Sequence, residues 1–194
     1  MRLFVAVDVD DDTRPAIGGI TDRLRAAMEE ARSAARISWI ESGRLHLTLQ
    51  FIGEVSDAAG EAIVTRLRPP VHLPPFEMRL RHIGTFPPSG RPRVVWLGVE
   101  RGDGLVRLQA EIGQRLADIA FRRESRPFSP HLTLARVRDG GSRVDSERIR
   151  ATQAEPAGGC TIDHMTLYQS RLSPRGPTYT PLLITPLTGA ERVE

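Results

Sequence analysis

The sequence predicts an α+β fold, a bilobal and pseudo-twofold duplicated unit in which two antiparallel sheets face a central cleft and helices cover the outer faces. The tetrapeptide His-Leu-Thr-Leu occurs at 46–49 and again, letter for letter, at 131–134, which is 85 positions later. Around each copy we expect the same order of strand, helix, HLTL strand, helix and strand. A turn rich in Pro and Gly at 87–92 separates the two series. This order is typical of a duplicated unit whose helices lie outside its sheets.

The first series opens with an apolar alternating segment at 2–9, rich in Val and Phe, which predicts a strand. Asp11, Asp12 and Thr13 are suitable helix N-caps, and Pro15 suits a first helical turn. Apolar residues then keep helical spacing as far as position 31, so a helix is expected there.

A short apolar segment at 37–40 leads through a turn into the first HLTL strand, predicted at 45–52 and closed by Gly53. Ser56 and Asp57 indicate the start of a second helix, which ends at a pair of prolines. Alternation at 76–83 predicts a further strand. On one of its faces we expect four residues, Phe76, Met78, Leu80 and His82.

The second series begins with the apolar segment 94–99, which is expected to pair with the preceding strand as a hairpin. Asp103 starts a helix with an apolar stripe that extends to Ile119. The second HLTL strand follows at 130–137. After it we expect the elements of the C-terminal part, which are a weak helix around 144–154, a strand at 162–172 and an edge strand at 179–187 that contains Pro181.

Each HLTL strand presents an imidazole and a hydroxyl on the same face. Because side chains alternate along a strand, His46 and Thr48 point to one side while the leucines point to the core. The second copy does the same with His131 and Thr133. If the two sheets are related by a pseudo-twofold axis, both pairs line one cleft, and we expect a single bilobal domain over 1–194 with one motif in each half.

Composition limits the classes of function. The chain has 194 residues with a formal net charge of +3, and all 27 of its basic residues are arginine, which suits bidentate contacts with phosphate. Cys160 is the only cysteine, so neither a disulfide framework nor a paired-cysteine metal site is expected. Neither a signal peptide nor a membrane-spanning stretch is indicated, and we expect a soluble, cytoplasmic protein that acts as a monomer.

Two histidines and two hydroxyls suit displacement at phosphorus. Near neutral pH one imidazole accepts a proton from a nucleophile while a second, cationic imidazole donates one to a leaving oxygen. A threonine beside each imidazole is placed to hold a phosphate oxygen. Arg136 lies five residues after His131, so strict alternation puts it on the opposite face, unless a bulge in the strand redirects it toward the phosphate.

With these motifs the chain resembles the two-histidine (2H) phosphoesterases, and among them the RNA 2′,3′-cyclic phosphodiesterases, formerly called 2′-5′ RNA ligases. The resemblance covers nearly the whole chain, from RLFVAVDV through HLTLQFIGEV, RVVWLGV and PFSPHLTLARV to LYQSRLSPRGPTYTPL. The RNA-directed subgroup is indicated by flanking residues, namely Phe51, Gly53, Phe128 and Arg136.

The resemblance implies hydrolysis of an RNA 2′,3′-cyclic phosphate end to a 2′-phosphomonoester, with no metal or other cofactor. It implies that His131 is the proton acceptor that activates water and His46 the proton donor to the departing 3′ oxygen. Thr48, Thr133 and Arg136 would bind the phosphate. The resemblance also implies the reverse reaction, which joins RNA ends through a 2′-5′ linkage and exchanges the roles of the two histidines.

Two other readings stay open at this point. His46 and His131 are residues that also bind zinc, although no further ligand falls at a recognisable spacing and the position two residues on is Thr in both copies. The cleft is also compatible with a non-catalytic module that binds RNA ends or a nucleotide. His82 and His164 lie in predicted strands and are interpreted as surface or core histidines.

Overall fold

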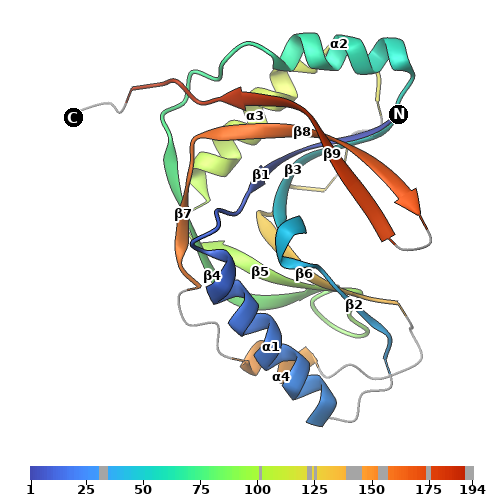
Figure 1. Cartoon of the computed structure of the whole chain (residues 1–194), viewed down its shortest axis with the longest axis vertical. Helices are drawn as coiled ribbons and strands as arrows, with labels where there is room; N and C mark the ends of the chain where they lie inside the picture. Colours follow the sequence, from blue (N-terminus) through green and yellow to red (C-terminus); the bar gives the residue numbers. More distant parts are fainter. Residues whose placement is uncertain are drawn as a thin grey trace.

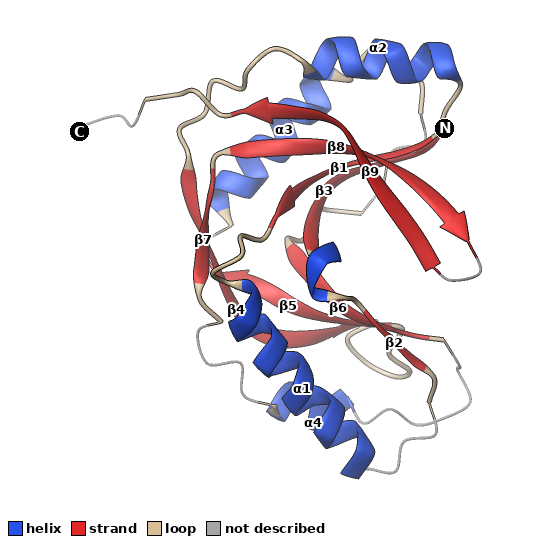
Figure 2. Ribbon diagram, in the orientation of Figure 1, coloured by secondary structure: helices blue, strands red, loops and turns tan. Residues whose placement is uncertain are grey.

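The computed structural model describes residues 1–30, 35–100, 102–121, 124, 126–138, 146–152, 157–173 and 176–190 of the chain. Within them the strands form two antiparallel sheets, with helices beside each (Figures 1 and 2). None of the helices in this part of the chain is long and apolar enough to cross a bilayer.

The first sheet has four strands in the order β3-β1-β8-β9. Every neighbouring pair in it is antiparallel. Its strands are β1 (Arg2–Asp8), β3 (His46–Glu54), β8 (His164–Ser173) and β9 (Gly176–Pro186).

The second sheet has five strands in the order β2-β6-β5-β4-β7, again with antiparallel neighbours. Its strands are β2 (Ile37–Trp39), β4 (Phe76–Phe86), β5 (Val94–Glu100), β6 (His131–Val137) and β7 (Gly159–Ile162). The hairpin between β4 and β5 is the one that the sequence predicts.

The helix α2 lies at one end of the molecule and α1 with α4 at the other, as predicted for helices on the outer faces (Figure 2). The remaining helix, α3, contacts β3 of the first sheet and β4 of the second. The bounds of these helices are α1 (Arg14–Glu30), α2 (Asp57–Leu67), α3 (Asp103–Arg115) and α4 (Ser146–Ala151). We call the four-stranded sheet with α2 and α3 the first lobe. The five-stranded sheet with α1 and α4 is the second lobe.

The two halves of the sequence exchange elements between the lobes. β1 lies in the first sheet, but α1, which follows it, packs in the second lobe, and the chain then returns to the first sheet through β3 (Figure 1). In the same way, β5 and β6 lie in the second sheet, but α3, which lies between them in the sequence, packs in the first lobe. The strand order β3-β1-β8-β9 of one sheet therefore corresponds to β6-β5-β4-β7 of the other. The duplication is visible in this correspondence, although neither lobe is a contiguous half of the chain.

The leucines of both HLTL motifs anchor their strands in the core. Leu47 and Leu132 are completely buried, and Leu49 and Leu134 are at most 3% exposed. Burying such side chains stabilises a fold by about 1.5–3 kcal/mol each. The motif strands are therefore rigid supports for the polar residues on their other face.

Two predictions about strand faces and ends are wrong. Gly53 does not close β3, since the strand continues to Glu54 and Gly53 adopts a positive φ of 85° at a register shift. His82 does not share the face of Met78 and Leu80. It has a φ of 61° at a bulge in β4, so Ile83 takes the next buried position.

The predicted strand at 162–172 is confirmed as β8 from His164 onward, but Ile162 belongs to β7, a separate strand in the other sheet. β7 ends at Ile162 and β8 begins at His164, and between them the chain passes from the second sheet to the first. Of the weak helix expected around 144–154, the structure contains α4, while Val144 and Ala154 lie outside the described residues. β9 is an edge strand, as expected from Pro181.

Candidate active site

The two HLTL strands lie against each other where the lobes meet. β3 and β6 are in contact although they belong to different sheets (Figure 1). His46 and Thr48 are half-buried and alternate with buried leucines, and His131 and Thr133 repeat the pattern. The structure thus places these four side chains on adjacent strands between the lobes.

The two imidazoles are held in the same way. Nδ1 of His46 lies 2.8 Å from the carbonyl oxygen of Arg44, and Nδ1 of His131 lies 2.7 Å from that of Ser129. A carbonyl oxygen only accepts hydrogen bonds, so each Nδ1 carries a proton and donates it. In both rings Nε2 is therefore the atom that is left to take up or release a proton.

A bulge in β6 turns Arg136 toward the histidines. Val95 pairs with Ala135 and Trp96 with Thr133, so Leu134 has no partner of its own in β5. Leu134 and Ala135 are consecutive buried residues, and the alternation restarts after them. Arg136 consequently lies on the same face as Thr133 and His131, as the sequence analysis required of a bulge. A register shift at the equivalent Leu49 interrupts β3.

Aromatic side chains surround each imidazole. The ring centroid of Phe4 lies 5.0 Å from that of His46, and Tyr179 meets His46 edge-on at 5.1 Å. Phe86 meets His131 edge-on at 4.9 Å, with Trp96 6.2 Å away. These contacts restrict the rotation of both rings and exclude water from one side of them.

A hollow of about 300 Å³ opens beside His46. Arg44 closes one side of it by donating to the carbonyl oxygen of Pro177 at 2.8 Å and pairing with Glu41 at 3.1 Å. The residues that line the hollow are Asp8, Glu41, Gly43, Arg44, His46, Tyr168, Pro177, Thr178 and Tyr179. Aromatic walls with a few polar groups are typical of small-molecule sites.

Comparison with known proteins places this arrangement in a family. The model of the 2′-5′ RNA ligase superfamily matches residues 20–173, which include both motifs. The chain belongs to this superfamily. It is 35% identical over 184 residues to the RNA 2′,3′-cyclic phosphodiesterase of Archaeoglobus fulgidus, covering 95% of this chain and 99% of that protein.

Solved structures of related proteins share the fold. The crystal structure of the Thermus thermophilus protein TT0787 has a TM-score of 0.77 and 28% identity, and the match covers 98% of this chain and 100% of that one. The crystal structure of E. coli LigT complexed with 3′-AMP has a TM-score of 0.66 and 29% identity, with 96% and 98% coverage. The α+β architecture with two antiparallel sheets is therefore that of solved members of the superfamily.

In this superfamily member, burial is the main influence on both histidines, and it lowers the pKa of each below the ordinary value of 6.5. The contacts with the carbonyls of Arg44 and Ser129 act in the opposite direction. The Arg136 guanidinium lowers the pKa of both imidazoles, which shows that one cation acts on the two rings. The carboxylate of Asp8 acts on His46 and raises its pKa.

Sequence reasoning missed the residues that surround His46. Asp8, Tyr168 and Tyr179 come from β1, β8 and β9 and meet only through the register of the first sheet. One signal was available, since Phe4, Ala6 and Asp8 alternate on one face of a predicted strand and a carboxylate there is unusual. Trp96 is half-buried and packs over Gly84 on the face of Thr133.

The zinc reading finds no third ligand in the described part of the chain. There, no group of three or more His, Cys, Asp or Glu side chains comes together in a way that would hold a metal ion. The groups around His46 and His131 are instead hydroxyl, guanidinium and aromatic groups, with the single carboxylate of Asp8 directly opposite His46. These groups suit binding of a phosphate and proton transfer.

Proposed function

We propose that the protein hydrolyses RNA 2′,3′-cyclic phosphate ends to 2′-phosphomonoesters by acid–base catalysis with two histidines and without a metal. The observation that carries the proposal is the pair of imidazoles on β3 and β6. Each donates a hydrogen bond from Nδ1 to a backbone carbonyl, and the charge of Arg136 lowers the pKa of both. The names of the curated relatives support the same activity.

In the proposed reaction, Nε2 of neutral His131 removes a proton from water as its oxygen attacks phosphorus. The bond between phosphorus and the 3′ oxygen breaks, and Nε2 of cationic His46 gives its proton to that oxygen. The products are a 2′-phosphate and a 3′-hydroxyl. The two histidines then return to their starting protonation states by exchange with solvent. A suitably placed acid and base each contribute about 10²–10⁴-fold to such a reaction.

Thr48, Thr133 and Arg136 are proposed to bind the non-bridging phosphate oxygens. Each threonine lies two residues after its histidine on the same strand face, so a phosphate between the imidazoles is within reach of both hydroxyls. The guanidinium of Arg136 supplies a fixed positive charge where negative charge increases in the transition state. The proposed site needs no residue from a second copy of the chain, and we propose that the protein acts as a monomer.

The hollow beside His46 is proposed to receive the terminal nucleoside. Both ester oxygens of the cyclic phosphate belong to the same ribose, so the residue that protonates the 3′ oxygen lies next to that ribose. Tyr168 and Tyr179 line the hollow and offer faces and edges for a nucleobase. The related E. coli LigT has a crystal structure in complex with 3′-AMP, which supports the binding of a nucleotide by a protein of this fold.

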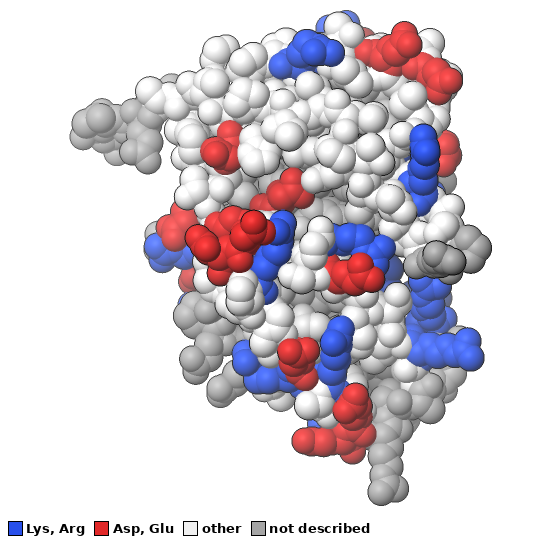
Figure 3. All heavy atoms as spheres, in the orientation of Figure 1, with Lys and Arg blue, Asp and Glu red and all other residues white. Residues whose placement is uncertain are grey.

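The RNA that precedes the cyclic end is proposed to cross the outer ends of β2 and β6. Arginines gather there on the face shown in Figure 3, whereas acidic and basic side chains alternate elsewhere on that face. At these strand ends, backbone hydrogen bonds bring the main chains of three arginines together. The amide of Arg138 donates to the carbonyl oxygen of Arg36, and the amide of the neighbouring Val137 donates to the carbonyl oxygen of Arg93. Such a cluster favours RNA phosphates, and binding is expected to weaken as salt concentration rises.

The test is turnover of a short RNA that ends in a 2′,3′-cyclic phosphate, with EDTA present. We expect the wild type to yield a 2′-phosphate end, identified by chromatography against 2′- and 3′-phosphate standards. His46→Ala and His131→Ala are each expected to lose at least about 10²-fold in rate. The same RNA with a 5′-hydroxyl acceptor tests the reverse 2′-5′ ligation.

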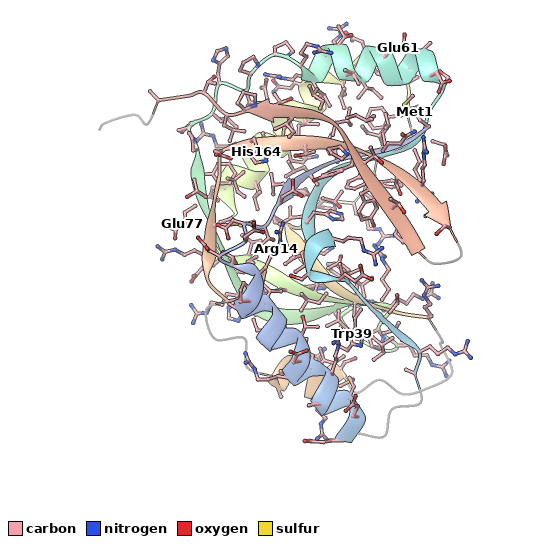
Figure 4. The ribbon with its side chains drawn as sticks, in the orientation of Figure 1. Met1, Arg14, Trp39, Glu61, Glu77 and His164 are labelled. Atoms are coloured by element: carbon pink, nitrogen blue, oxygen red, sulfur yellow. The ribbon has the colours of Figure 1, made fainter. Side chains whose placement is uncertain are left out.

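The control is His164→Ala. His164 is the first residue of β8, next to the connection from β7, and its Nδ1 is 2.5 Å from Asp163, so full activity is expected (Figure 4). Binding of the RNA without turnover would contradict the proposal and leave a module that recognises RNA ends. Turnover only after addition of a divalent metal would contradict the metal-free mechanism.

A further inference from the structure

The two histidines have nearly identical immediate surroundings, so the assignment of donor and acceptor needs a difference between them. Both follow the same sequence pattern, both donate through Nδ1 to a carbonyl two residues earlier, and both strands contain a register shift at the last leucine of the motif. A symmetric pair of imidazoles would protonate to the same extent. The difference must come from the neighbouring strands.

The neighbouring strands differ at one corresponding position. In the pairing of β1 with β3, Asp8 stands directly opposite His46. In the equivalent pairing of β5 with β6, Gly98 stands opposite His131. Residues directly opposite in an antiparallel pair share a face, and their Cβ atoms are about 4.5–5.5 Å apart. One imidazole therefore has a carboxylate beside it, and the other has a glycine.

Hydrogen bonds hold the Asp8 carboxylate in place. The Tyr168 hydroxyl donates to it, 2.8 Å from Oδ1 and 2.9 Å from Oδ2, and the buried Thr166 hydroxyl donates to Oδ2 at 3.2 Å. Burial and the nearby carboxylate raise the pKa of Tyr168, so its hydroxyl stays protonated and remains a donor. Asp8 and His46 line the same hollow.

A side chain at Gly98 is sterically excluded. A Cβ atom added there would lie 2.9 Å from the carbonyl oxygen of Arg81 and 3.1 Å from the ring of Trp96. The first distance is shorter than real Cβ contacts with backbone allow. The packing of the second sheet thus prevents a carboxylate beside His131, and the asymmetry is a property of the fold.

We infer that Asp8 is a positioning residue that makes His46, rather than His131, the proton donor. This inference rests on the function proposed above. The carboxylate stabilises the imidazolium form of His46, which is the form that protonates the leaving 3′ oxygen. His131 has no such partner in the described part of the chain and stays neutral, which is the form that accepts a proton from water.

Other polar and charged groups near His46 do not make the same distinction. They are Arg136 from β6, Tyr168 from β8, Tyr179 from β9, and Glu41 with Arg44 from the turn before β3. Arg136 lowers the pKa of both histidines. Glu41 is paired with Arg44. Burial, the largest influence, lowers the pKa of both rings, and only the Asp8 contribution acts on His46 alone.

The experiment is an NMR titration of the imidazole signals of His46 and His131 in the substrate-free protein, for the wild type and Asp8→Asn. Asparagine keeps the shape of the side chain and its acceptor for Tyr168 but removes the charge. We expect the pKa of His46 to fall by about half a unit or more, while that of His131 stays within error of the wild type.

Two matched variants separate charge from packing. Glu41→Gln removes the other carboxylate of the hollow and is expected to leave the titration of His46 unchanged, because Arg44 neutralises that charge. Tyr168→Phe removes a hydrogen bond but keeps the Asp8 charge, so the pKa of His46 is expected not to fall. A fall in either variant as large as that in Asp8→Asn would overturn the inference.

The pH dependence of kcat/KM is the second readout. In Asp8→Asn the descending limb, which reports the proton donor, is expected to move to lower pH while the ascending limb stays in place. Asp8→Glu restores the charge and is expected to return the limb toward its wild-type position. A rise in KM with unchanged limbs would instead assign Asp8 to substrate binding and overturn the inference.

The two proposals fail in distinguishable ways. If the wild type turns over the cyclic phosphate but Asp8→Asn shifts neither histidine, or shifts both equally, the inference alone is wrong. If the wild type shows no turnover, the proposed function is wrong and the inference falls with it, whatever the titration shows.

Discussion

His46 and His131 hold Nδ1 against equivalent backbone carbonyls, at 2.8 Å and 2.7 Å, on two strands that meet between the lobes. This relationship fixes the tautomer of each neutral ring and leaves Nε2 of both as the reactive atom. Because the backbone itself makes the contact, substitutions of surrounding side chains change the protonation of the rings more readily than their orientation.

The pH optimum of hydrolysis is expected to lie on the acidic side of 6.5. The rate rises as His131 loses its proton and falls as His46 loses its own, and burial lowers the pKa of both below 6.5. The check is kcat/KM for a cyclic-phosphate oligonucleotide at constant ionic strength, from about pH 5 to pH 8. A maximum above the ordinary histidine pKa would contradict the effect of burial.

Arg136→Ala is expected to lower the maximal rate by about 10²–10³-fold, the usual cost of removing one group that stabilises charge in the transition state. The guanidinium lowers the pKa of both histidines, so its removal raises both and moves the whole pH profile to higher pH. This shift is opposite in direction to that expected for Asp8→Asn. Steady-state kinetics over the pH range measures both effects.

Arg138→Ala is the matched control for Arg136. Arg138 directly follows β6 and is exposed like Arg136, but it does not influence the pKa of either histidine. Its removal is expected to weaken RNA binding and reduce the salt dependence while both limbs of the profile stay in place. Equal pH shifts in the two variants would show that general surface charge, rather than Arg136, governs the imidazoles.

The position of Arg136 illustrates what the sequence could and could not predict. The HLTL strands followed from local information, because alternation and the leucines specify which face is buried. The side on which Arg136 lies depends on a bulge, and that bulge is created by the register between β6 and β5. The prediction that His82 shares a face with Met78 and Leu80 is wrong for the same reason, because β4 has a bulge at His82. Sequence periodicity does not reveal such register shifts, because they arise from pairing with another strand.

The surroundings of His46 and the composition of the lobes also depend on contacts between segments that are far apart in the sequence. Asp8 and Tyr168 are 160 positions apart and meet because β1 pairs with β8, and nothing in either segment specifies that partner. The order of elements predicted a duplication correctly. It did not predict that α1 packs in the second lobe and α3 in the first, since a repeated order is equally compatible with two contiguous lobes.

Thr48→Val and Thr133→Val are each expected to lower kcat/KM by about 10²-fold through loss of a hydrogen bond to a phosphate oxygen. Valine keeps the branched shape that suits a strand, so far-UV circular dichroism and the unfolding midpoint are expected to change little. Thr48→Ser and Thr133→Ser retain the hydroxyl and are the controls, with most of the activity expected to remain. Equal losses in the serine and valine variants would point to packing instead of hydrogen bonding.

Gly84→Ala is expected to destabilise the protein and to disturb the site at His131. A Cβ at this buried position would lie 2.1 Å from Cζ2 of Trp96, so the indole would have to leave the surface of the second sheet. Overpacking of this kind costs about 1–3 kcal/mol of the free energy of unfolding. Since Trp96 and Phe86 form one wall of the His131 environment, activity is expected to fall as well.

Gly113→Ala is the control for that substitution. Gly113 lies within α3 and a Cβ there meets nothing within 4 Å, so alanine is expected to raise the free energy of unfolding by about 0.5–1 kcal/mol through its helix preference. Denaturant unfolding of both variants, followed by tryptophan fluorescence, measures the contrast. If Gly84→Ala were as stable and as active as the wild type, the indole would have room to move aside, and Trp96 would not be the rigid wall of the His131 site that its packing against Gly84 indicates.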